Sequence, residues 1–329
     1  MANQYAYDWS DVAFASKKPL RELKATFIVA PRELSVARLT SLVKEYLSSG
    51  HVVLGISKEP FVDGFSDQPQ FRMLEAGPAE VLSEKIAKAK IPHKLFLLSY
   101  HQRELPYILE KVLFRQVVLV NGSWRQSFHT TPAYYALAKN GQQPVFVSPF
   151  VSEDEAIKTA TSLTTQISNR LKLPSEQTKP NTYTEQQLMT LADQSAQQSF
   201  DHTFQTGAVL AKKSGSTYRL LATAYNQIVP YETFAMHHGA SREQFQSPPN
   251  DLNHYDTVHA EVQGILAAQR NGVNLAGTAM FVNLLPCPVC SRILVLSGIS
   301  EVVYQHDHSD AYAVRLLQKA GLEVRRLVV

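Results

Sequence analysis

Cysteine is scarce in this chain, and no long hydrophobic run occurs. Only two cysteines are present among 329 residues, which excludes a fold held by disulfides. No stretch of about 18 apolar residues could form a membrane-spanning helix. The first twenty residues lack the basic-then-apolar pattern of a secretory signal, so we expect a cytoplasmic protein that makes no membrane contact.

The chain also lacks a strong net charge and the common phosphate-binding loops. The formal net charge is +3, which does not by itself indicate a nucleic-acid partner. Neither G-x-x-x-x-G-K-[ST] nor G-x-G-x-x-G is present. Two strand ends, 55–58 and 120–123, could hold a ligand at the edge of a sheet, or could be ordinary turns.

The length and the hydrophobic pattern predict two domains. In the first half, apolar runs alternate with segments of helical periodicity, which favours a doubly wound, Rossmann-like α/β domain with a mostly parallel sheet over residues 1–171. The segment 172–183 is rich in Pro, Ser and Thr and is predicted to be a linker. A second α/β domain is expected over 184–329. The expected strands are 25–30, 51–57, 94–100, 116–123, 143–150, 206–214, 218–226, 278–285, 299–305 and 322–328.

One pattern in the second half indicates metal chemistry. His259 precedes a predicted helix, and Cys287 and Cys290 open another, in the order H-x-E followed by P-C-x-x-C. Helix N-termini favour thiolates, and one imidazole with two thiolates binds Zn²⁺ while leaving a fourth position for water. Glu261 could take the proton of that water. C-x-x-C alone would also suit a redox site or structural zinc, but the combined pattern is typical of zinc deaminases.

The segment from His259 to Val324 carries a family resemblance. HAEVQGILAAQ, TAMFVNLLPCPVCSRILVLSGISEVVY and the closing SDAYAVRLLQKAGLEV resemble the cytidine deaminase superfamily, most closely its deoxycytidylate (dCMP) deaminase branch, over roughly 184–328. The resemblance implies a three-layer α/β/α domain with a five-stranded mixed sheet. It also implies zinc held by His259, Cys287 and Cys290, with Glu261 as the proton shuttle.

The same resemblance suggests substrate contacts. The backbone N–H of Ala260 would meet the pyrimidine carbonyl, and Asn226 would hydrogen-bond the sugar, although an asparagine after a strand is also a common turn residue. Tyr304 could stack on the base or only pack at a strand end. Arg242 lies in a segment longer than the family usually has, and it could pair with a phosphate or with a surface acid.

Two histidine pairs give weaker signals. His237 and His238, in the same long segment, are expected to be solvated loop residues rather than ligands of a phosphate or a second metal. His306 and His308 follow a strand at a sheet edge, where a binding loop is favoured and a metal site is not.

These observations lead to a functional hypothesis with alternatives. We expect a zinc-dependent hydrolase that deaminates a cytosine-containing nucleotide, with zinc-bound hydroxide attacking C4, Glu261 carrying protons, and ammonia released. One alternative is a nucleic-acid base deaminase acting on tRNA adenosine or cytidine, with the first domain binding RNA. Residues 1–180 carry a net charge of +5 and residues 181–329 of −2, which tilts against it. A non-catalytic nucleotide-binding regulator is the other alternative. The family resemblance suggests a homo-oligomer.

Overall fold

The computed structural model describes residues 25–174, 182–248, 251, 253–307 and 311–328. The chain divides into two compact units. The first contains Met1–Ala160 together with Thr233–Tyr255, and the second contains Thr161–Glu232 together with Asp256–Val329. The segment Thr233–Tyr255 therefore packs with the first unit, although it interrupts the second unit in sequence. Within the described residues, no helix combines the length and apolar character needed to cross a membrane.

The first unit contains a five-stranded sheet in which every pairing is parallel. Its strand order is β3-β2-β1-β4-β5. The elements are β1 (Ala25–Val29), α2 (Val36–Leu47), β2 (His51–Ser57), η2 (Pro69–Phe71), α3 (Ala76–Lys88), β3 (Leu95–Tyr100), η3 (Gln102–Glu104), α4 (Leu105–Lys111), β4 (Gln116–Val120), η4 (Phe128–Thr130), α5 (Pro132–Lys139), β5 (Val145–Val147) and α6 (Glu153–Leu171).

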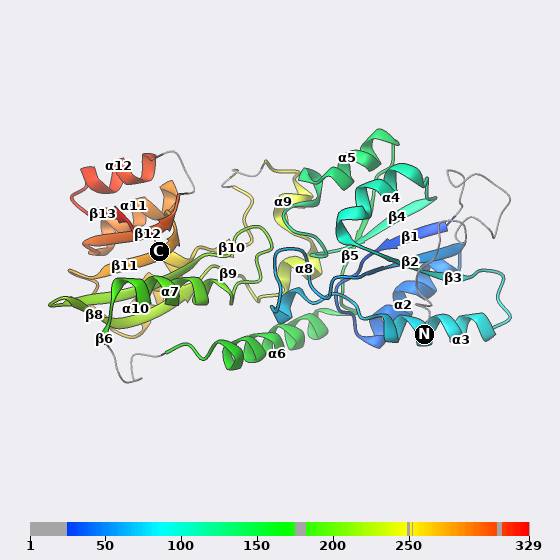
Figure 1. Ribbon diagram of the computed structural model, residues 1–329, viewed down its shortest axis with the longest axis horizontal. Helices are drawn as coiled ribbons and strands as arrows, with labels where there is room; N and C mark the ends of the chain where they lie inside the picture. Colours follow the sequence, from blue (N-terminus) through cyan, green and yellow to red (C-terminus); the bar gives the residue numbers. More distant parts are fainter. Residues whose placement is uncertain (1–24, 175–181, 249–250, 252, 308–310, 329) are drawn as a thin grey trace. The chain divides into compact units, whose positions relative to one another are not determined.

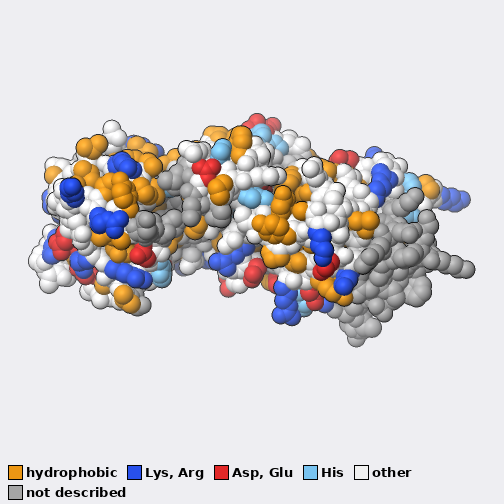
Figure 2. Space-filling view, turned by 90° about the horizontal axis from the view of Figure 1, so that it is seen from above, with side chains coloured by type: hydrophobic (Ala, Val, Ile, Leu, Met, Phe, Trp, Pro, Cys, Tyr) orange, Lys and Arg blue, Asp and Glu red, His pale blue; other side chains and the backbone are white. Residues whose placement is uncertain are grey.

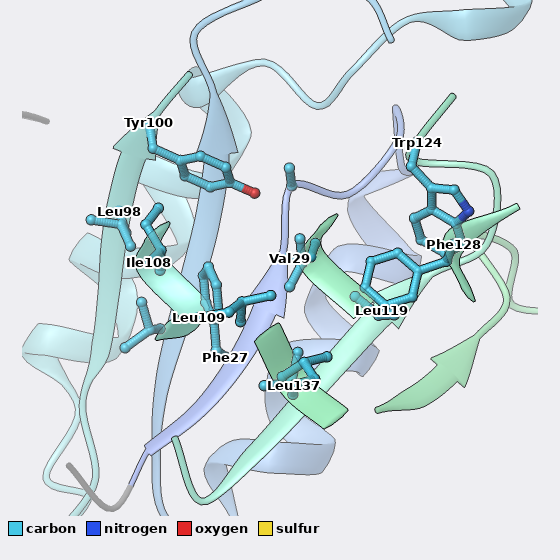
Figure 3. Packing of buried hydrophobic residues seen from close by; sticks show 14 of the residues in the cluster. Phe27, Val29, Leu98, Tyr100, Ile108, Leu109, Leu119, Trp124, Phe128 and Leu137 are labelled. Carbon is cyan, nitrogen blue, oxygen red and sulfur yellow. The ribbon is translucent and has the colours of Figure 1, made fainter. Parts of the chain in front are cut away.

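Helices cover both faces of this sheet, because successive strand residues point to opposite sides. Phe27 and Val29 of β1 pack with residues of α4 and α5 in one hydrophobic cluster (Figure 3). Ile28, between them, packs with α2 in a second cluster on the other face. Helix α3 was not predicted from the apolar pattern, since Ala79 is its only buried residue.

The second unit contains a mixed sheet of six strands in the order β13-β12-β11-β7-β8-β6 (Figure 1). Its elements are β6 (Thr182–Tyr183), α7 (Glu185–Ala196), β7 (Gly207–Ser214), β8 (Thr217–Tyr225), β9 (Gln227–Ile228), β10 (Thr257–Val258), α10 (Ala260–Arg270), β11 (Ala279–Leu284), α11 (Pro288–Ser297), β12 (Glu301–His306), α12 (Tyr312–Lys319) and β13 (Glu323–Arg326). The short helices α8 (Phe234–His238) and α9 (Ser241–Gln244) belong to the first unit.

The expectation of five strands was wrong by one. The additional strand is β6, which the sequence analysis placed in the linker, and it pairs antiparallel with β8 at Arg219 and Tyr218. A strand of two residues has no hydrophobic period, so composition alone indicated a loop.

Two layers of helices enclose this second sheet. Side chains of α10, α11 and α12 share one hydrophobic cluster with strand residues. Leu188, Met189, Leu191 and Ala192 of α7 pack in a separate cluster against other side chains of the sheet. The helices that carry the H-x-E and C-x-x-C motifs therefore contribute to the same helical layer.

Candidate metal centre

The first turns of α10 and α11 bring the histidine and both cysteines together. His259 is the N-cap of α10, directly after β10, and Cys287 is the N-cap of α11. Cys290 lies one turn further along α11, and its backbone N–H donates to Sγ of Cys287 at 3.4 Å. The free N–H groups and the positive end of each helix dipole stabilise negative charge at this point.

The geometry of the three side chains fits a zinc ion. Nδ1 of His259 lies 3.5 Å from Sγ of Cys287 and 3.3 Å from Sγ of Cys290. Tetrahedral zinc with ordinary Zn–N and Zn–S bonds would set a nitrogen and a sulfur about 3.6 Å apart. Among the described residues, this is the one group of three or more His, Cys, Asp or Glu side chains whose ligand atoms all lie within 4.8 Å of one another.

Glu261 adds a buried carboxyl group beside these ligands. It lies in the first turn of α10, its side chain is 3% exposed, and Oε2 has no hydrogen-bond partner within the described part of the chain. Burial raises the pKa of Glu261 above its usual range, while the nearby His259 opposes that shift. A buried carboxyl oxygen without a partner is costly, so it indicates a group that works on a ligand.

The two cysteines differ in their tendency to ionise. Hydrogen bonds from Cys290 and from His259 lower the pKa of Cys287 to about 4, against the opposing effect of burial. The hydrogen bond with Cys287, together with burial, raises the pKa of Cys290. The pKa of His259 is raised, first by its hydrogen bond with Cys287 and further by the charges of Glu261 and Asp201. A divalent cation at this site would therefore displace protons when it binds.

Asn226 lies at the end of β8 and is 4% exposed. Its Oδ1 accepts from the backbone N–H of Thr206 at 2.8 Å, and its Nδ2 donates to the carbonyl of Phe204 at 2.8 Å. Asp201, which the sequence analysis missed, accepts the N–H groups of Thr203 and Phe204. The hydrogen bonds of Asn226 therefore hold the loop 201–206 against the start of β7. The negative charge of Asp201 in this loop contributes to the raised pKa of His259.

Asn283 supports the same loop and was also missed. It lies in β11, where Oδ1 accepts from the N–H of Gly207 and Nδ2 donates to the carbonyl of Gln205. Asn283 lies near the carboxyl end of β11, the position at which open α/β sheets bind ligands, and that placement is the signal that could have identified it. Asp201 lies in the loop between α7 and β7, where the sequence gives no such signal.

Ala260 and Tyr304 belong to the second unit as well. Ala260 is fully buried and directly follows the histidine, so its backbone is at the positive end of α10. Tyr304 is 8% exposed and packs in the cluster shared by α10, α11 and α12, with its backbone paired to Val282. His306, at the end of β12, is exposed, and His308 lies outside the described residues.

Arg242 belongs to the first unit, unlike the metal-binding triad. Its guanidinium lies over the ring of Tyr255, 4.2 Å from the centroid, and Nη2 donates to the carbonyl of Asp251 at 3.4 Å. His237 and His238 are also in the first unit, where they contact Ser148 and Glu153. The structure therefore places none of these three side chains in the compact unit that holds the zinc ligands.

Comparisons with known proteins converge on one family. The family model described as "Cytidine and deoxycytidylate deaminase zinc-binding region" matches residues 182–306. A deoxycytidylate deaminase from Pongo abelii is 31% identical over 150 residues, which span 43% of this chain and 77% of that protein. The deoxycytidylate deaminase of Enterobacteria phage T2 is 34% identical over 84 residues, which span 25% of this chain and 45% of that protein.

A solved structure also matches. It is a dCMP deaminase from the cyanophage S-TIM5 in apo form, 20% identical, and the match covers 44% of this chain and 96% of that one with a TM-score of 0.32. The match to the family model leaves residues 1–181 outside it.

Proposed function

Because this chain belongs to the cytidine and deoxycytidylate deaminase family, we propose that it hydrolyses the amino group of deoxycytidine monophosphate or a closely related cytosine nucleotide. The chain is a hydrolase acting on C–N bonds, a nucleotide deaminase whose cofactor is zinc. The observation that carries the proposed deamination chemistry is the buried Glu261 carboxyl group beside the His259, Cys287 and Cys290 donor set, and the choice of substrate rests on the similarity to deoxycytidylate deaminases. A purely structural zinc site has no use for that carboxylate.

In this proposal the metal has a limited and defined task. Zinc held by His259, Cys287 and Cys290 supplies a Lewis acid that makes a water molecule acidic near neutral pH. The three side chains arise from the starts of two helices, so the helix dipoles help to keep both sulfurs ionised. Their rigid attachment to packed helices also keeps the donor geometry constant during turnover.

Glu261 moves the protons of the reaction. Its carboxylate accepts a proton from the water whose oxygen bonds to C4 of the base, and delivers it to ring N3. It then accepts the second proton of that oxygen and passes it to the departing amino group. The C4–N bond breaks with its electron pair on nitrogen, so that ammonia and a uracil nucleotide leave. Burial raises the pKa of Glu261 above its usual range, which makes its carboxyl group a better proton acceptor than an exposed glutamate.

Two neighbouring groups orient the substrate in this proposal. The backbone N–H of Ala260 donates to the pyrimidine carbonyl, since the first N–H groups of a helix have no partner within the helix. Asn226 lies beside the sugar, and the loop 201–206 that it supports forms the adjoining wall. Tyr304 remains a proposed contact of the base, whereas Arg242, which is buried in the other compact unit, is not proposed as a contact of the phosphate.

We also propose a division of labour between the halves of the chain. Catalysis belongs to the second compact unit, Thr161–Glu232 with Asp256–Val329, and the first unit, with its Rossmann-like sheet, contributes no catalytic group. These bounds replace the expected ones of 1–171, 172–183 and 184–329, because Thr182–Tyr183 form a strand of the second sheet and 233–255 pack with the first unit. The parallel strand order of the first sheet supports that assignment. We further propose a homo-oligomer, which light scattering at micromolar concentration tests.

A nucleic-acid substrate receives less support. Acidic side chains lie among basic ones on the described surface seen in Figure 2, so that face shows no continuous basic track. Binding a polynucleotide depends mainly on neutralising many phosphates. The second half, with its net charge of −2, is poorly suited to that task.

An ammonia-release screen tests the proposal. The purified chain is offered cytosine, deoxycytidine, dCMP, CMP, dCTP, guanine and a tRNA anticodon stem-loop, with Glu261→Gln as the inactive control. We expect the largest kcat/KM for dCMP. Release from the stem-loop or from guanine alone would overturn the substrate assignment while leaving the zinc site intact.

A further inference from the structure

The strand order of the first unit places a topological switch point, the usual ligand-binding position in open α/β sheets, at the carboxyl end of its sheet. Strands β1 and β4 are neighbours, but the chain leaves them in opposite directions. Helix α2, which follows β1, packs on one face of the sheet, and α5, which follows β4, packs on the other. In open parallel sheets such a divergence separates the two connections and forms the usual ligand-binding crevice.

A buried arginine lies directly after β1 at this switch point. Arg32 is 4% exposed, and among the described residues it forms no ion pair. Its backbone N–H donates to Oγ of Ser123 at 3.1 Å, and Nη1 donates to the carbonyl of Gly122 at 2.8 Å. Its Nε has no hydrogen-bond partner in the described part of the chain. Arg32 therefore spans the gap between the end of β1 and the end of β4.

The burial of the Arg32 guanidinium is energetically costly. Burial lowers its pKa to about 9, with only a small opposing effect from Glu33, an exposed side chain that also lies 3.9 Å from Arg72. A buried cation without an anionic partner is strongly unfavourable, and the ring of Phe71, whose centroid lies 5.3 Å from Cζ of Arg32, offsets part of that cost. A neutral residue of similar size would fill the same volume without that cost.

The β4 side of the switch point provides further polar groups. Asn121, 5% exposed, follows β4 directly, and its Oδ1 has no hydrogen-bond partner within the described residues. Gly122 has a φ of +74°, and a Cβ placed on it would lie 3.3 Å from Nη1 of Arg32. Glycine is required there both for the left-handed backbone and to leave room beside the guanidinium.

A second arginine extends the same edge. Arg38, in the first turn of α2, donates from Nε to the carbonyl of Ser148 at 2.8 Å, just beyond β5. Oγ of Ser148 contacts Nδ1 of His237 at 2.7 Å. Of the acids of this edge, Glu153 is exposed and Glu155 is half-buried and accepts from the N–H of Val151, so among the described residues no fully buried carboxylate balances Arg32.

We propose that this end of the sheet binds a phosphate-bearing anion, with the Arg32 guanidinium as its buried counter-ion beside Gly122. A planar guanidinium donates two parallel hydrogen bonds to phosphate oxygens, and a glycine turn lets the backbone approach them closely. The site lies wholly within the first unit and is separate from the zinc ligands of the second. It supplies a role for the half of the chain that the family model does not match.

Calorimetric titration of the full-length protein in chloride buffer tests this site. The probes are inorganic pyrophosphate, adenosine diphosphate and malonate, with Arg32→Met as the test variant and Arg115→Met as the control. Arg115 is an exposed arginine at the opposite edge of the same sheet, where Nη1 donates to the carbonyl of Ser49. We expect Arg32→Met to weaken binding of a phosphate probe by at least about tenfold, and Arg115→Met to leave it unchanged.

The three probes distinguish a site for phosphate groups alone from a site for a nucleotide. Binding of pyrophosphate and adenosine diphosphate with similar affinity indicates a site for the phosphates alone, and tighter adenosine diphosphate binding indicates a nucleotide. Both outcomes support the site only if they depend on Arg32. Equal binding of malonate, no binding of either phosphate probe, or binding that survives Arg32→Met overturns the proposal.

If Arg32→Met does not fold, two glycine variants provide a second test of the site. Gly122→Ala and Gly141→Ala both place a Cβ on a left-handed residue, but only the Cβ at position 122 meets Arg32, since nothing lies within 4 Å of the other. We expect similar losses of melting temperature and a selective loss of phosphate binding in Gly122→Ala. Equal phosphate binding by the two variants would contradict the placement of the anion beside Gly122 and Arg32.

Discussion

Nδ1 of His259 lies 3.3 Å from Sγ of Cys290, although the two residues are 31 positions apart. The contact arises because α10 and α11 pack in one helical layer with their first turns together, while β11 connects them through the sheet. The metal centre is therefore a property of two helix starts, and its integrity depends on the packing beneath them.

Cys290→Ala is expected to abolish zinc binding. Two remaining donors cannot hold the ion with the affinity of three, and the loss of metal should destabilise the second unit because the ligands join two helices. Metal analysis of the purified chain should give about one zinc per wild-type molecule and almost none for the variant. Val289→Ala, an exposed change between the two cysteines, should retain the metal. Full zinc content in Cys290→Ala would contradict the assigned ligand set.

Glu261→Gln is expected to separate metal binding from turnover. The amide keeps the size of the side chain but cannot accept a proton, so deamination should slow by at least about 10³-fold. Zinc content and melting temperature should change little, because His259, Cys287 and Cys290 are untouched. Steady-state kinetics with metal analysis measures both effects, and Glu84→Gln, an exposed acid on α3, controls for charge. Parallel loss of zinc would show a structural role for Glu261.

Glu232 is expected to make stability depend on pH. Burial raises its pKa to about 7 in the folded chain, against 4.5 for an ordinary glutamate, although Tyr225 donates to it at 2.8 Å. The folded state holds this proton more tightly, so the contribution is fully present below pH 4.5 and is lost as the pH rises through 7. The 2.5-unit difference corresponds to about 3 kcal/mol.

The measurement compares urea unfolding of the wild type and Glu232→Gln from pH 4.5 to pH 8. The amide does not ionise, so the variant should gain relative stability as the pH rises, by up to about 3 kcal/mol at pH 8. Glu84→Gln should follow the wild type throughout. A constant difference between wild type and Glu232→Gln across this range would show that the carboxyl group does not titrate there.

Arg325→Gln is expected to loosen the edge of the second sheet. In β13, Nε of Arg325 donates to Glu301 at 2.8 Å and Nη1 donates to Glu185 at 2.9 Å. Removing the guanidinium leaves Glu301, whose side chain is 9% exposed, without its cation. Since Arg325 is 32% exposed, we expect a loss of about 1–3 kcal/mol in the free energy of unfolding, below the value for fully buried pairs.

Arg326→Gln is the matched control for that prediction. Arg326 is exposed, and its Nε donates to the carbonyl of Gln305 at 2.9 Å. Urea unfolding should place the control within about 0.5 kcal/mol of the wild type. Equal effects of the two substitutions would mean that the ion-pair network contributes little.

Much of the fold could be predicted because its information is local. The alternation of apolar runs with segments of helical periodicity predicted where strands occur along the chain. The strands β7, β8 and β11 begin and end within one or two residues of the expected bounds. Short or weakly patterned elements were missed for the same reason. A strand as short as β6 and a helix as exposed as α3 leave little periodic signal.

The sequence by itself was enough to predict His259, Cys287 and Cys290 as zinc ligands with Glu261 beside them, because H-x-E and P-C-x-x-C combine residue types and spacings that have few other uses. Only the tertiary structure decided what surrounds them. Asn226 is engaged with the loop 201–206, Tyr304 is packed in a core, and Arg242 belongs to the other compact unit. It also decided that Arg32 is buried beside Gly122, ninety positions away. Motif spacing records neighbours along the chain, whereas burial and long-range contact depend on how the sheets and helices pack together.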